Sequence, residues 1–295
     1  MPDPQVVVVT GSSSGFGELI AKTLAVKGHR VFASMRDIGG RNAAAAEALT
    51  GWAREHDCRI EVIELDVTDT ASVEAATSDV LAREGRIDVA VNNAGVAASG
   101  PLEAFDVEQM QDLFDVNVFG PMRVAKAVLP QMRQRGSGLL IHVSSTLGRI
   151  LPKSGGLYPA SKWAVEGLAE SLHYQLLPFG VDLVILEPGS FPTPALSKSM
   201  VARDEAISKA YAARPATARR AREVPPDHIP PDPQEVADAV LTLVEAPPHQ
   251  RPLRMVVGPV FTHGISEFNA TYEQARDQLA ESLLRPDQII SWARR

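Results

Sequence analysis

Short apolar runs alternate along this chain with longer stretches of helical periodicity. Val6–Val9 is an unbroken β-branched run, which is typical of a strand buried on both faces of a parallel sheet. The predicted strands cover residues 6–9, 30–34, 60–65, 87–91, 139–143, 181–186 and 253–257. Because helical stretches separate most of these runs, the pattern predicts an α/β fold built from βαβ units.

Helices are expected at residues 18–27, 41–56, 108–135, 158–177, 233–245 and 267–284. One apolar stripe of the helix at 158–177 consists of Ala164, Leu168, Leu172 and Leu176. A stripe of this kind is typical of a helix that packs against a core.

The helix expected at 108–135 contains Pro121. Proline has no N–H group, so Pro121 cannot bond to the carbonyl oxygen of Asn117, four residues earlier. We predict a kink beside the active site, where this free carbonyl can hold a water molecule. The alternative is a tolerated proline without a task.

The first predicted strand runs directly into Thr10–Gly17, and a helical pattern follows. In such a unit, glycines let the backbone approach a pyrophosphate, and the helix N-terminus offers unpaired N–H groups. The glycine spacing differs from the common G-x-G-x-x-G fingerprint, and a flexible serine-glycine loop is the alternative. The residues expected to bind a dinucleotide here are Gly11, Ser13, Ser14, Gly15, Phe16 and Gly17.

Arg36 and Asp37 follow the second predicted strand, where folds of this kind contact the adenosine ribose. A carboxylate accepts a hydrogen bond from the 2′-hydroxyl of NAD, whereas an arginine suits the 2′-phosphate of NADP. Since Arg36 comes first, we expect NADP rather than NAD. The alternative is that Arg36 points to solvent and Asp37 binds the ribose.

Two further strand ends supply candidate cofactor contacts. Asp66 and Val67 follow the third strand, where Asp66 can accept a hydrogen bond from the adenine amino group. Alternatively, Asp66 or Asp69 caps the next helix. After the fourth strand, the small residues in Asn92–Gly95 leave room for a ligand. Side-chain amides in this segment can also tie strands together, and for Asn92 we expect that structural role to be the larger one.

The candidate catalytic residues are Ser145, Tyr158 and Lys162. Tyr158 and Lys162 lie four residues apart, on one face of a helix, and a nearby ammonium is expected to lower the pKa of the phenol toward that of a working base. The Ser145 hydroxyl can polarise a carbonyl group that the phenol protonates. Pro159 disfavours helical backbone at Tyr158, which is therefore expected at the N-cap, with looser stacking on Lys162. A solvated helix face is the alternative for the isolated Tyr-x-x-x-Lys pattern.

Composition narrows the function classes. A chain of 295 residues that is 45% hydrophobic can bury one large core, so a single domain over residues 1–295 is expected. The net charge of −7, without a basic block, argues against a nucleic-acid partner. The lone Cys58 and the absence of a long apolar segment predict a cytoplasmic protein without a membrane anchor. The histidines show no metal-ligand spacing, and no metal site is expected.

Residues 194–232 are rich in alanine, arginine and proline, which predicts a mobile helical lid over the pocket. A cluster of arginines in it, which suits either an anionic substrate or solvent, comprises Arg214, Arg219, Arg220 and Arg222. A C-terminal extension, 259–295, contains the last predicted helix and can pack on the domain or on a second subunit.

Taken together and in this order, the motifs resemble the short-chain dehydrogenase/reductase family. They are Thr10–Gly17, Asn92–Gly95, Asn117, Ser145, Tyr158 with Lys162, and Pro188–Gly189. The resemblance covers about residues 5 to 193 and the final helix and strand. It implies a single Rossmann-like, doubly wound domain, with a seven-stranded parallel sheet and helices on both faces.

The resemblance also implies residue roles. Tyr158 would be the general acid/base, Ser145 would orient the substrate carbonyl, and Lys162 would bind the nicotinamide ribose and lower the tyrosine pKa. Asn117 would hold a water molecule in a proton relay. Pro159, where many relatives have a small residue, is a mild departure. The cofactor contacts outside the glycine-rich turn would be Arg36, Asp66, Val67, Asn93, Ala94, Gly95, Tyr158, Lys162, Pro188, Gly189, Phe191 and Thr193.

The expected function is therefore reversible, NADP-dependent hydride transfer between nicotinamide and a carbonyl compound or secondary alcohol, by a homodimer or homotetramer. The alternative is a non-catalytic NADP-binding protein that senses redox state or regulates a partner. Relatives of that kind commonly lack the tyrosine or the lysine, and this chain has both Tyr158 and Lys162.

Overall fold

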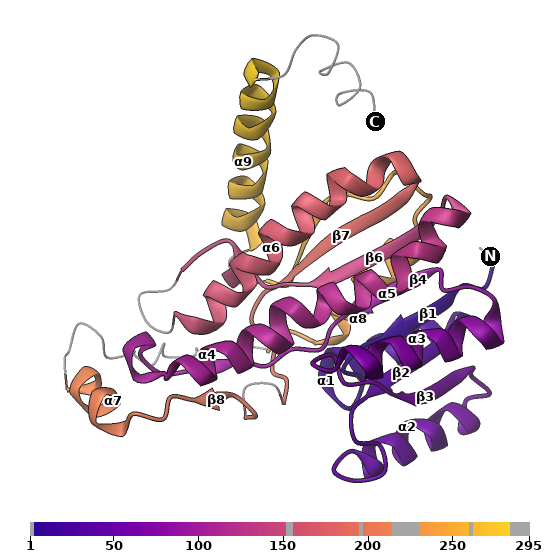
Figure 1. Cartoon of the computed structure of the whole chain (residues 1–295), viewed down its shortest axis with the longest axis horizontal. Coiled ribbons are helices and arrows are strands. Elements are labelled where there is room, and N and C mark those ends of the chain that lie inside the picture. Colours follow the sequence, from indigo (N-terminus) through magenta and orange to yellow (C-terminus); the bar gives the residue numbers. More distant parts are fainter. Residues whose placement is uncertain (1–2, 152–155, 195–196, 214–229, 260–261, 284–295) are drawn as a thin grey trace.

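The computed structural model describes residues 3–151, 156–194, 197–213, 230–259 and 262–283. At its centre is one seven-stranded sheet with the order β3-β2-β1-β4-β6-β7-β9 (Figure 1). The strands are β1 (Val6–Val9), β2 (Arg30–Met35), β3 (Ile60–Glu64), β4 (Val89–Asn92), β6 (Gly138–Val143), β7 (Val181–Pro188) and β9 (Arg254–Val257). All seven predicted strands are present, and every pairing between them is parallel.

Helices cover both faces of this sheet. Those on one face are α1 (Gly15–Val26), α2 (Ala43–Glu55) and α8 (Gln234–Glu245), and those on the other are α3 (Thr70–Glu84), α5 (Gly120–Arg135) and α6 (Leu157–Leu176). Successive side chains of a strand point to opposite faces, so Val7 and Val9 of β1 join the first core. Val6 and Val8 join the second. The unbroken apolar run thus has a core on each side, as the doubly wound prediction requires.

The strand order places a crevice at the middle of the sheet. β1 pairs with β2 on one side and with β4 on the other. The chain therefore runs outward from β1 to β3 and then returns to start the second half beside β1. In open α/β sheets, ligands bind outside the carboxyl ends of the strands at such a reversal.

The helix predicted at 108–135 is in fact two helices. α4 (Val107–Phe114) and α5 are joined by a π-helical turn at Asp115–Phe119, in which the N–H of Gly120 bonds to the Asp115 carbonyl, five residues earlier. Pro121 lies in the first turn of α5, where a missing N–H costs little. The predicted kink is thus a π turn followed by a new helix start.

α6 begins earlier than predicted. Its N-cap is Gly156, so Tyr158 lies inside the first turn, and the prediction that Tyr158 is the N-cap was wrong. Leu157 is buried in a cluster with Phe105, and this packing favours a helix start before Pro159. A proline in the first turn loses no helical hydrogen bond, because the first N–H groups of a helix have no intrahelical partner.

The buried face of α6 also differs from the predicted stripe, since Leu168 is 40% exposed. Glu166 and Glu170 occupy core-facing positions instead. Both carboxylates accept hydrogen bonds from Arg254 of β9, at 3.0 and 2.7 Å. Local apolar periodicity failed here because a cation from a distant strand makes two buried carboxylates tolerable.

The predicted lid is described in part. Residues 197–213 contain a short strand, β8 (Met200–Val201), which pairs with β5 (Ala98–Ser99), and a helix, α7 (Glu205–Ala212). The predicted arginine cluster, which comprises Arg214, Arg219, Arg220 and Arg222, lies outside the described residues.

The predicted C-terminal helix is confirmed as α9 (Thr262–Leu283), which projects from the body (Figure 1). Buried polar contacts hold its first half. Asn269 accepts a hydrogen bond from the Arg149 guanidinium at 2.7 Å and donates one to the Glu187 carboxylate at 2.6 Å. Through Glu187, the next-to-last residue of β7, α9 is linked to the carboxyl edge of the sheet.

Within the described ranges, no helix has the length and apolar character needed to cross a membrane. In the same ranges, no three His, Cys, Asp or Glu side chains are grouped in a way that could hold a metal ion.

Candidate active site

A cavity of about 640 Å³ lies at the carboxyl edge of the sheet, around the point where the strand order reverses. All but three of the predicted site residues line it. They are Gly11, Ser13, Ser14, Gly15, Phe16, Arg36, Asp66, Val67, Asn93, Ala94, Gly95, Ser145, Tyr158, Lys162, Pro188, Gly189 and Thr193. The three exceptions are Gly17, Asn117 and Phe191, which are buried behind the cavity wall. Their predicted roles in cofactor binding and catalysis stay predictions.

The glycine-rich turn connects β1 to α1 beneath this cavity. Gly11 and Gly15 have φ angles of +70° and +62°, which L side chains rarely adopt. A Cβ on Gly17 would overlap the Gly11 carbonyl oxygen, so Gly17 serves close packing of the turn. A Cβ on Gly15, by contrast, would meet nothing nearer than Thr193 at 3.7 Å. The turn is thus a backbone cradle open to a ligand, as a pyrophosphate requires.

Asn93, and not Asn92, ties the turn to the neighbouring strand. The Asn93 side-chain amide donates to the carbonyl oxygens of Thr10 and Gly11 at 2.8 and 3.1 Å. The Asn92 amide is buried and has no hydrogen-bond partner among the described residues. It is paired in register with His142, whose ring nitrogens likewise lack partners there. The predicted tying role therefore belongs to the second asparagine of the motif.

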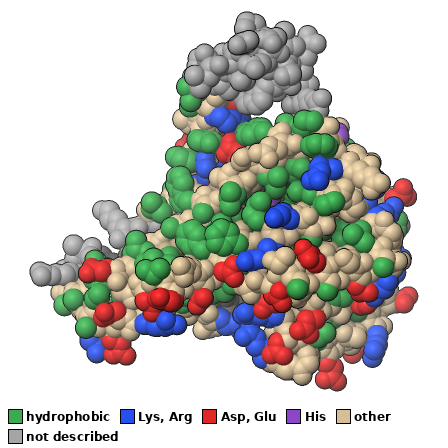
Figure 2. Space-filling model, viewed as in Figure 1, with side chains coloured by type: hydrophobic (Ala, Val, Ile, Leu, Met, Phe, Trp, Pro, Cys, Tyr) green, Lys and Arg blue, Asp and Glu red, His purple; other side chains and the backbone are tan. Residues whose placement is uncertain are grey.

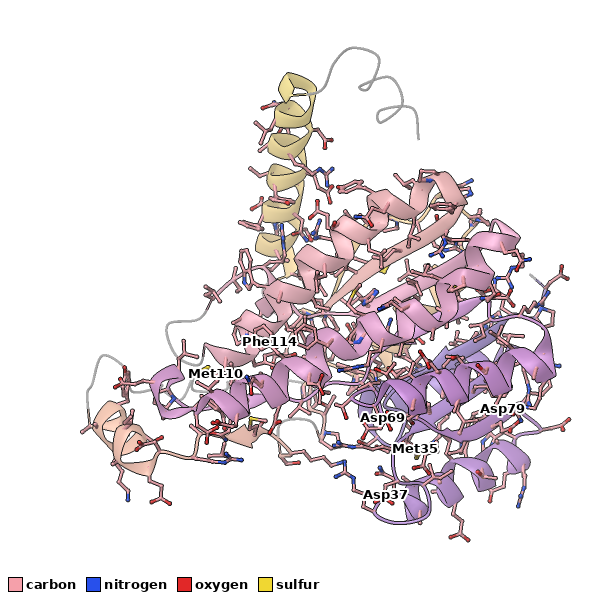
Figure 3. The ribbon with its side chains drawn as sticks, in the orientation of Figure 1. Met35, Asp37, Asp69, Asp79, Met110 and Phe114 are labelled. Carbon is pink, nitrogen blue, oxygen red and sulfur yellow. The ribbon has the colours of Figure 1, made fainter. Side chains whose placement is uncertain are left out.

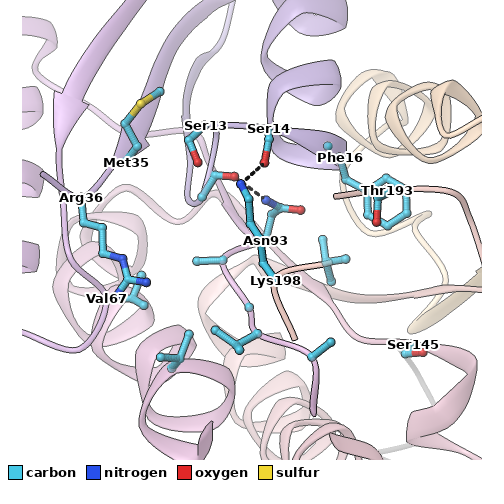
Figure 4. Close-up of a pocket in the computed structure, with 18 of the residues that line it drawn as sticks. Ser13, Ser14, Phe16, Met35, Arg36, Val67, Asn93, Ser145, Thr193 and Lys198 are labelled. Carbon is cyan, nitrogen blue, oxygen red and sulfur yellow. Dashed lines mark hydrogen bonds between the residues drawn. The ribbon is translucent and has the colours of Figure 1, made fainter. Parts of the chain in front are cut away.

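One end of the cavity, where the adenosine is predicted to bind and which is here called the adenosine end, is cationic. Arg36 lines it and extends along its wall (Figure 4), and Arg41 joins it from the turn before α2. Asp37 is not among the lining residues and lies in the loop beyond β2 (Figure 3). Its carboxylate accepts a hydrogen bond from the Arg41 backbone N–H at 2.9 Å. Of the two residues considered for the ribose, Arg36 lines the cavity and Asp37 does not.

The two aspartates after β3 have separate tasks. Asp69 is the N-cap of α3 and accepts from the Ala71 N–H at 2.9 Å. Asp66 lines the cavity, and one of its carboxylate oxygens accepts from the Thr68 N–H and hydroxyl. Burial works against its ionisation, but these hydrogen bonds and nearby arginines hold the pKa of Asp66 below its usual value. It is therefore an anionic acceptor within a largely cationic wall.

Ser145, Tyr158 and Lys162 meet at the opposite end of the cavity. Ser145 follows β6 and caps the short helical turn Thr146–Gly148, accepting from the Leu147 N–H at 3.1 Å. Its side chain is close enough to that of Tyr158 to act on the pKa of the phenol. The Lys162 ammonium lies 5.6 Å from the centre of the Tyr158 ring and donates to the Val143 carbonyl at 2.8 Å.

The predicted low pKa of the phenol is not found. Burial raises the pKa of Tyr158 to about 12, although the Ser145 side chain works in the opposite direction. Burial also lowers the pKa of Lys162 to about 8, against the charge of Glu166. The spacing in the sequence correctly predicted that the Lys162 ammonium lies near the Tyr158 ring. The pKa of Tyr158 is nevertheless raised, because burial removes the phenolate from water. The phenol is therefore neutral near pH 7, the form that donates a proton.

Asn117 supports the cavity wall from behind. Its side chain accepts from the Val96 N–H at 2.8 Å and donates to the Val96 carbonyl at 2.9 Å and the Ser161 hydroxyl at 3.0 Å. It thus joins the π turn to the wall segment after β4 and to α6. A water molecule on its backbone carbonyl stays a prediction.

Some lining residues were not predicted from the sequence. The polar ones are Arg41, Asn42, Ser144 and Lys198. The apolar ones are Met35, Leu65, Val96, Ala97, Val116 and Val143. Arg41 carried a weak signal, because it precedes a helix that follows the ribose-binding position. Lys198 carried none, because only the path of the chain after β7 brings it to the cavity.

Comparison with known proteins gives one consistent match. The family model described as short chain dehydrogenase matches residues 5–204. Human 17-beta-hydroxysteroid dehydrogenase type 1 is 37% identical over 258 residues, which cover 82% of this chain and 74% of that protein. The 3-ketodihydrosphingosine reductase of Bacteroides thetaiotaomicron is 35% identical over 64% of this chain. That alignment spans 65% of the reductase, slightly less than two thirds of its length.

Solved structures agree. A short-chain dehydrogenase from Streptomyces avermitilis has a TM-score of 0.74 and 35% identity, with 95% of this chain and 96% of that one covered. An alcohol dehydrogenase from Thermococcus sibiricus, complexed with 5-hydroxy-NADP, has a TM-score of 0.69 at 28% identity, covering 88% and 98%. A 3-ketoacyl-(acyl-carrier-protein) reductase from Brucella melitensis, complexed with NADH, has a TM-score of 0.71 at 26% identity, covering 87% and 98%.

Proposed function

This chain belongs to the short-chain dehydrogenase family, and we propose that it is an NADP-dependent oxidoreductase that interconverts a carbonyl compound and its secondary alcohol. One observation carries the proposal. Ser145, Tyr158 and Lys162 line one large cavity together, with the Lys162 ammonium 5.6 Å from the centre of the Tyr158 ring. When bound, the nicotinamide cofactor supplies or accepts the hydride.

In this proposal, the chain's own residues handle the proton and the carbonyl. Ser145 donates a hydrogen bond to the substrate carbonyl oxygen, which polarises it, and Tyr158 gives that oxygen a proton during reduction. A neutral phenol suits the reduction direction. In the oxidation direction Tyr158 must accept the proton, and the positive charge of Lys162 stabilises the phenolate that this requires. Asn117 positions the wall between α6 and β4 and is proposed to hold the relay water.

Two guanidinium groups support NADP as the cofactor. Arg36 and Arg41 both line the adenosine end. Two guanidinium groups suit the charge of the 2′-phosphate of NADP, whereas the neutral 2′-hydroxyl of NAD needs no cation. The remaining predicted contacts are proposed to hold the adenine at Asp66 and Val67 and the pyrophosphate at the glycine-rich turn. Pro188, Gly189 and Thr193 are proposed to hold the nicotinamide end. Phe191 supports this edge through its contact with Phe16, with ring centres 5.6 Å apart.

An apolar substrate fits the wall beside Tyr158. Val96, Ala97 and Val116 are apolar residues of the cavity that Tyr158 also lines, and such residues suit an apolar substrate. The human relative is named for a hydroxysteroid and the bacterial one for a ketosphingoid base, and both names denote largely apolar molecules. We infer that the carbonyl or alcohol group of this chain's substrate is carried on an apolar skeleton.

We propose a homodimer or homotetramer in which the single domain of residues 1–295 is the subunit. Figure 2 shows apolar side chains gathered on the surface over α4 and α6. Phe119, Trp163 and Leu168 are among the large exposed hydrophobic residues. A cytoplasmic location stays a prediction from the sequence.

The test is NADPH consumption, followed by its fluorescence, across a panel of ketones and aldehydes that runs from small polar compounds to steroid ketones and long-chain 3-keto compounds. We expect turnover with at least one apolar ketone and NADP-dependent oxidation of the matching alcohol. Tight NADPH binding with no consumption across the whole panel would instead support the non-catalytic, regulatory alternative.

A further inference from the structure

Lys198 is a charged cavity residue whose presence the sequence motifs do not explain. It belongs to residues 197–213, here called the strap, which follow the cofactor edge of β7. Residues 201–203 of the strap are bound to the first turn of α4. The Gln109 side chain donates to the Val201 carbonyl at 2.8 Å, and Arg203 pairs with Asp106 at 2.7 Å. Ala202 between them is buried.

These contacts determine where Lys198 can reach. The β5–β8 pairing aligns Met200 with Ala98, in the wall segment that follows β4. Lys198, two residues before this anchor, lines the cavity, and its ammonium lies 3.4 Å from the Ser14 hydroxyl. Figure 4 shows the side chain extending toward Ser14 and Asn93 from the opposite side of the cavity.

The charge of Lys198 has no counterion among the residues that the structure describes. Across the part of the chain that the structure describes, no carboxylate forms an ion pair with it. The other lysine of the strap, Lys209, pairs with Glu205 at 3.2 Å. An ammonium held against a neutral hydroxyl at a cavity wall is available for an anionic ligand.

Four cationic side chains among the described residues of the cavity wall lie at three positions along it. Arg36 and Arg41 lie at the adenosine end, and Lys162 lies beside Tyr158. Lys198 lies between them, at Ser14, the residue that caps α1 at the glycine-rich turn. In a dinucleotide, the group between the two nucleosides is the pyrophosphate, which carries two negative charges.

We infer that Lys198 is a ligand of the cofactor pyrophosphate, contributed by the strap and acting from the side opposite the glycine-rich turn. This inference rests on the proposed nicotinamide-dinucleotide function. It assigns a specific task to the strap: bound cofactor joins the strap, through Lys198, to the turn between β1 and α1. Since the pyrophosphate is common to NADP and NAD, Lys198 strengthens binding of both cofactors equally.

The test compares dissociation constants and dissociation rates of NADPH and NADH for wild type, Lys198→Met and Lys198→Arg. Lys198→Met should weaken both cofactors by about five- to ten-fold, the effect of a partly exposed charge-assisted hydrogen bond. Most of the change should be in the dissociation rate. Lys198→Arg should stay within about three-fold of wild type, because it keeps the charge. The difference between wild type and Lys198→Met should shrink in 1 M salt, as screening requires.

Lys209→Met is the matched control, since it removes a lysine of the strap that already has a carboxylate partner. It should leave both affinities unchanged. Equal affinities for wild type and Lys198→Met would overturn the inference, as would a loss confined to NADPH, which would place Lys198 at the 2′-phosphate. If wild-type protein bound neither cofactor, the proposed function itself would be wrong.

Discussion

The two ends of the cavity differ in burial. At the end with the proposed catalytic residues, here called the catalytic end, Ser145 and Lys162 are only 8% and 5% exposed. Ser145 follows a strand end, and Lys162 lies on a packed helix. At the adenosine end, Arg36 and Arg41 are exposed and sit in the connection between β2 and α2. The polar groups of the first end are therefore buried in the protein, whereas the charged groups of the second end are exposed to solvent.

This difference in burial predicts which substitutions change the turnover rate and which change the affinity for the cofactor. Buried hydrogen-bonding groups act on the charge that develops during a reaction, and water does not screen them. Exposed cations contribute binding energy that is screened by solvent and salt. Substitutions at the buried end should therefore change turnover with little effect on cofactor affinity, and substitutions at the exposed end should do the reverse.

Ser145→Ala should give the largest effect of the variants that keep Tyr158. Removing the hydroxyl that polarises the carbonyl is expected to lower kcat by about 100-fold. The dissociation constant of NADPH, measured by fluorescence titration, should change less than about two-fold. Ser145→Thr, which keeps a hydroxyl, should recover a substantial part of the activity. A variant without the hydroxyl that turns over normally would remove Ser145 from the mechanism.

Arg36→Ala tests the exposed end. It should weaken NADPH binding by about ten-fold, leave NADH binding unchanged, and preserve turnover once the cofactor is saturating. Adding Arg41→Ala should reduce the preference for NADPH further. If Arg36 can be removed without any loss of NADP preference, the assignment of NADP is wrong.

The pH dependence of binding should differ between the ends. Burial lowers the pKa of Lys162 to about 8, so its ammonium is lost as the pH rises through 8. If Lys162 contacts the nicotinamide ribose in its charged form, NADPH affinity should fall by a few-fold between pH 7 and 9. Lys162→Met should remove this fall, whereas Arg36→Ala should keep it. Equal pH profiles for wild type and Lys162→Met would contradict the role of Lys162.

The smallest effect is expected behind the catalytic end, at Glu187. Burial and the charge of Glu166 raise the pKa of Glu187 above that of an ordinary carboxyl. A raised folded-state pKa means that protonation stabilises the fold, and that this stability is lost as the pH rises through the folded pKa. The side chain of Glu187→Gln is neutral at every pH. The melting temperature of the variant minus that of wild type should therefore increase by a few degrees from pH 5 to pH 8. A constant difference would mean that Glu187 does not titrate in this range.

Much of the fold followed from local pattern. The seven strands and the turn at Thr10–Gly17 were predictable because each is continuous in sequence and its burial is set by its own residues. The exposed Leu168 was not predictable, because Glu166 and Glu170 become core residues only when Arg254, more than 80 residues away, pairs with them.

The site divides in the same way. Ser145, Tyr158 and Lys162 were found by spacing, and the structure brings all three to one cavity. The direction of the Tyr158 pKa shift could not be predicted from the sequence, because it depends on desolvation, which only the folded chain determines. Lys198 was missed because its position depends on a strand pairing between residues about 100 apart.

The most direct measurement concerns Tyr158. Turnover and NADPH affinity should be determined side by side for wild type, Tyr158→Phe and the surface control Tyr211→Phe, with a substrate identified in the carbonyl panel. If the phenol transfers the proton, Tyr158→Phe will lose about 10²- to 10⁴-fold in kcat while its NADPH dissociation constant stays within about three-fold of wild type, and Tyr211→Phe will match wild type in both. Near-normal turnover in Tyr158→Phe would show that the proton comes from elsewhere and that the buried end of the cavity is not the catalytic centre.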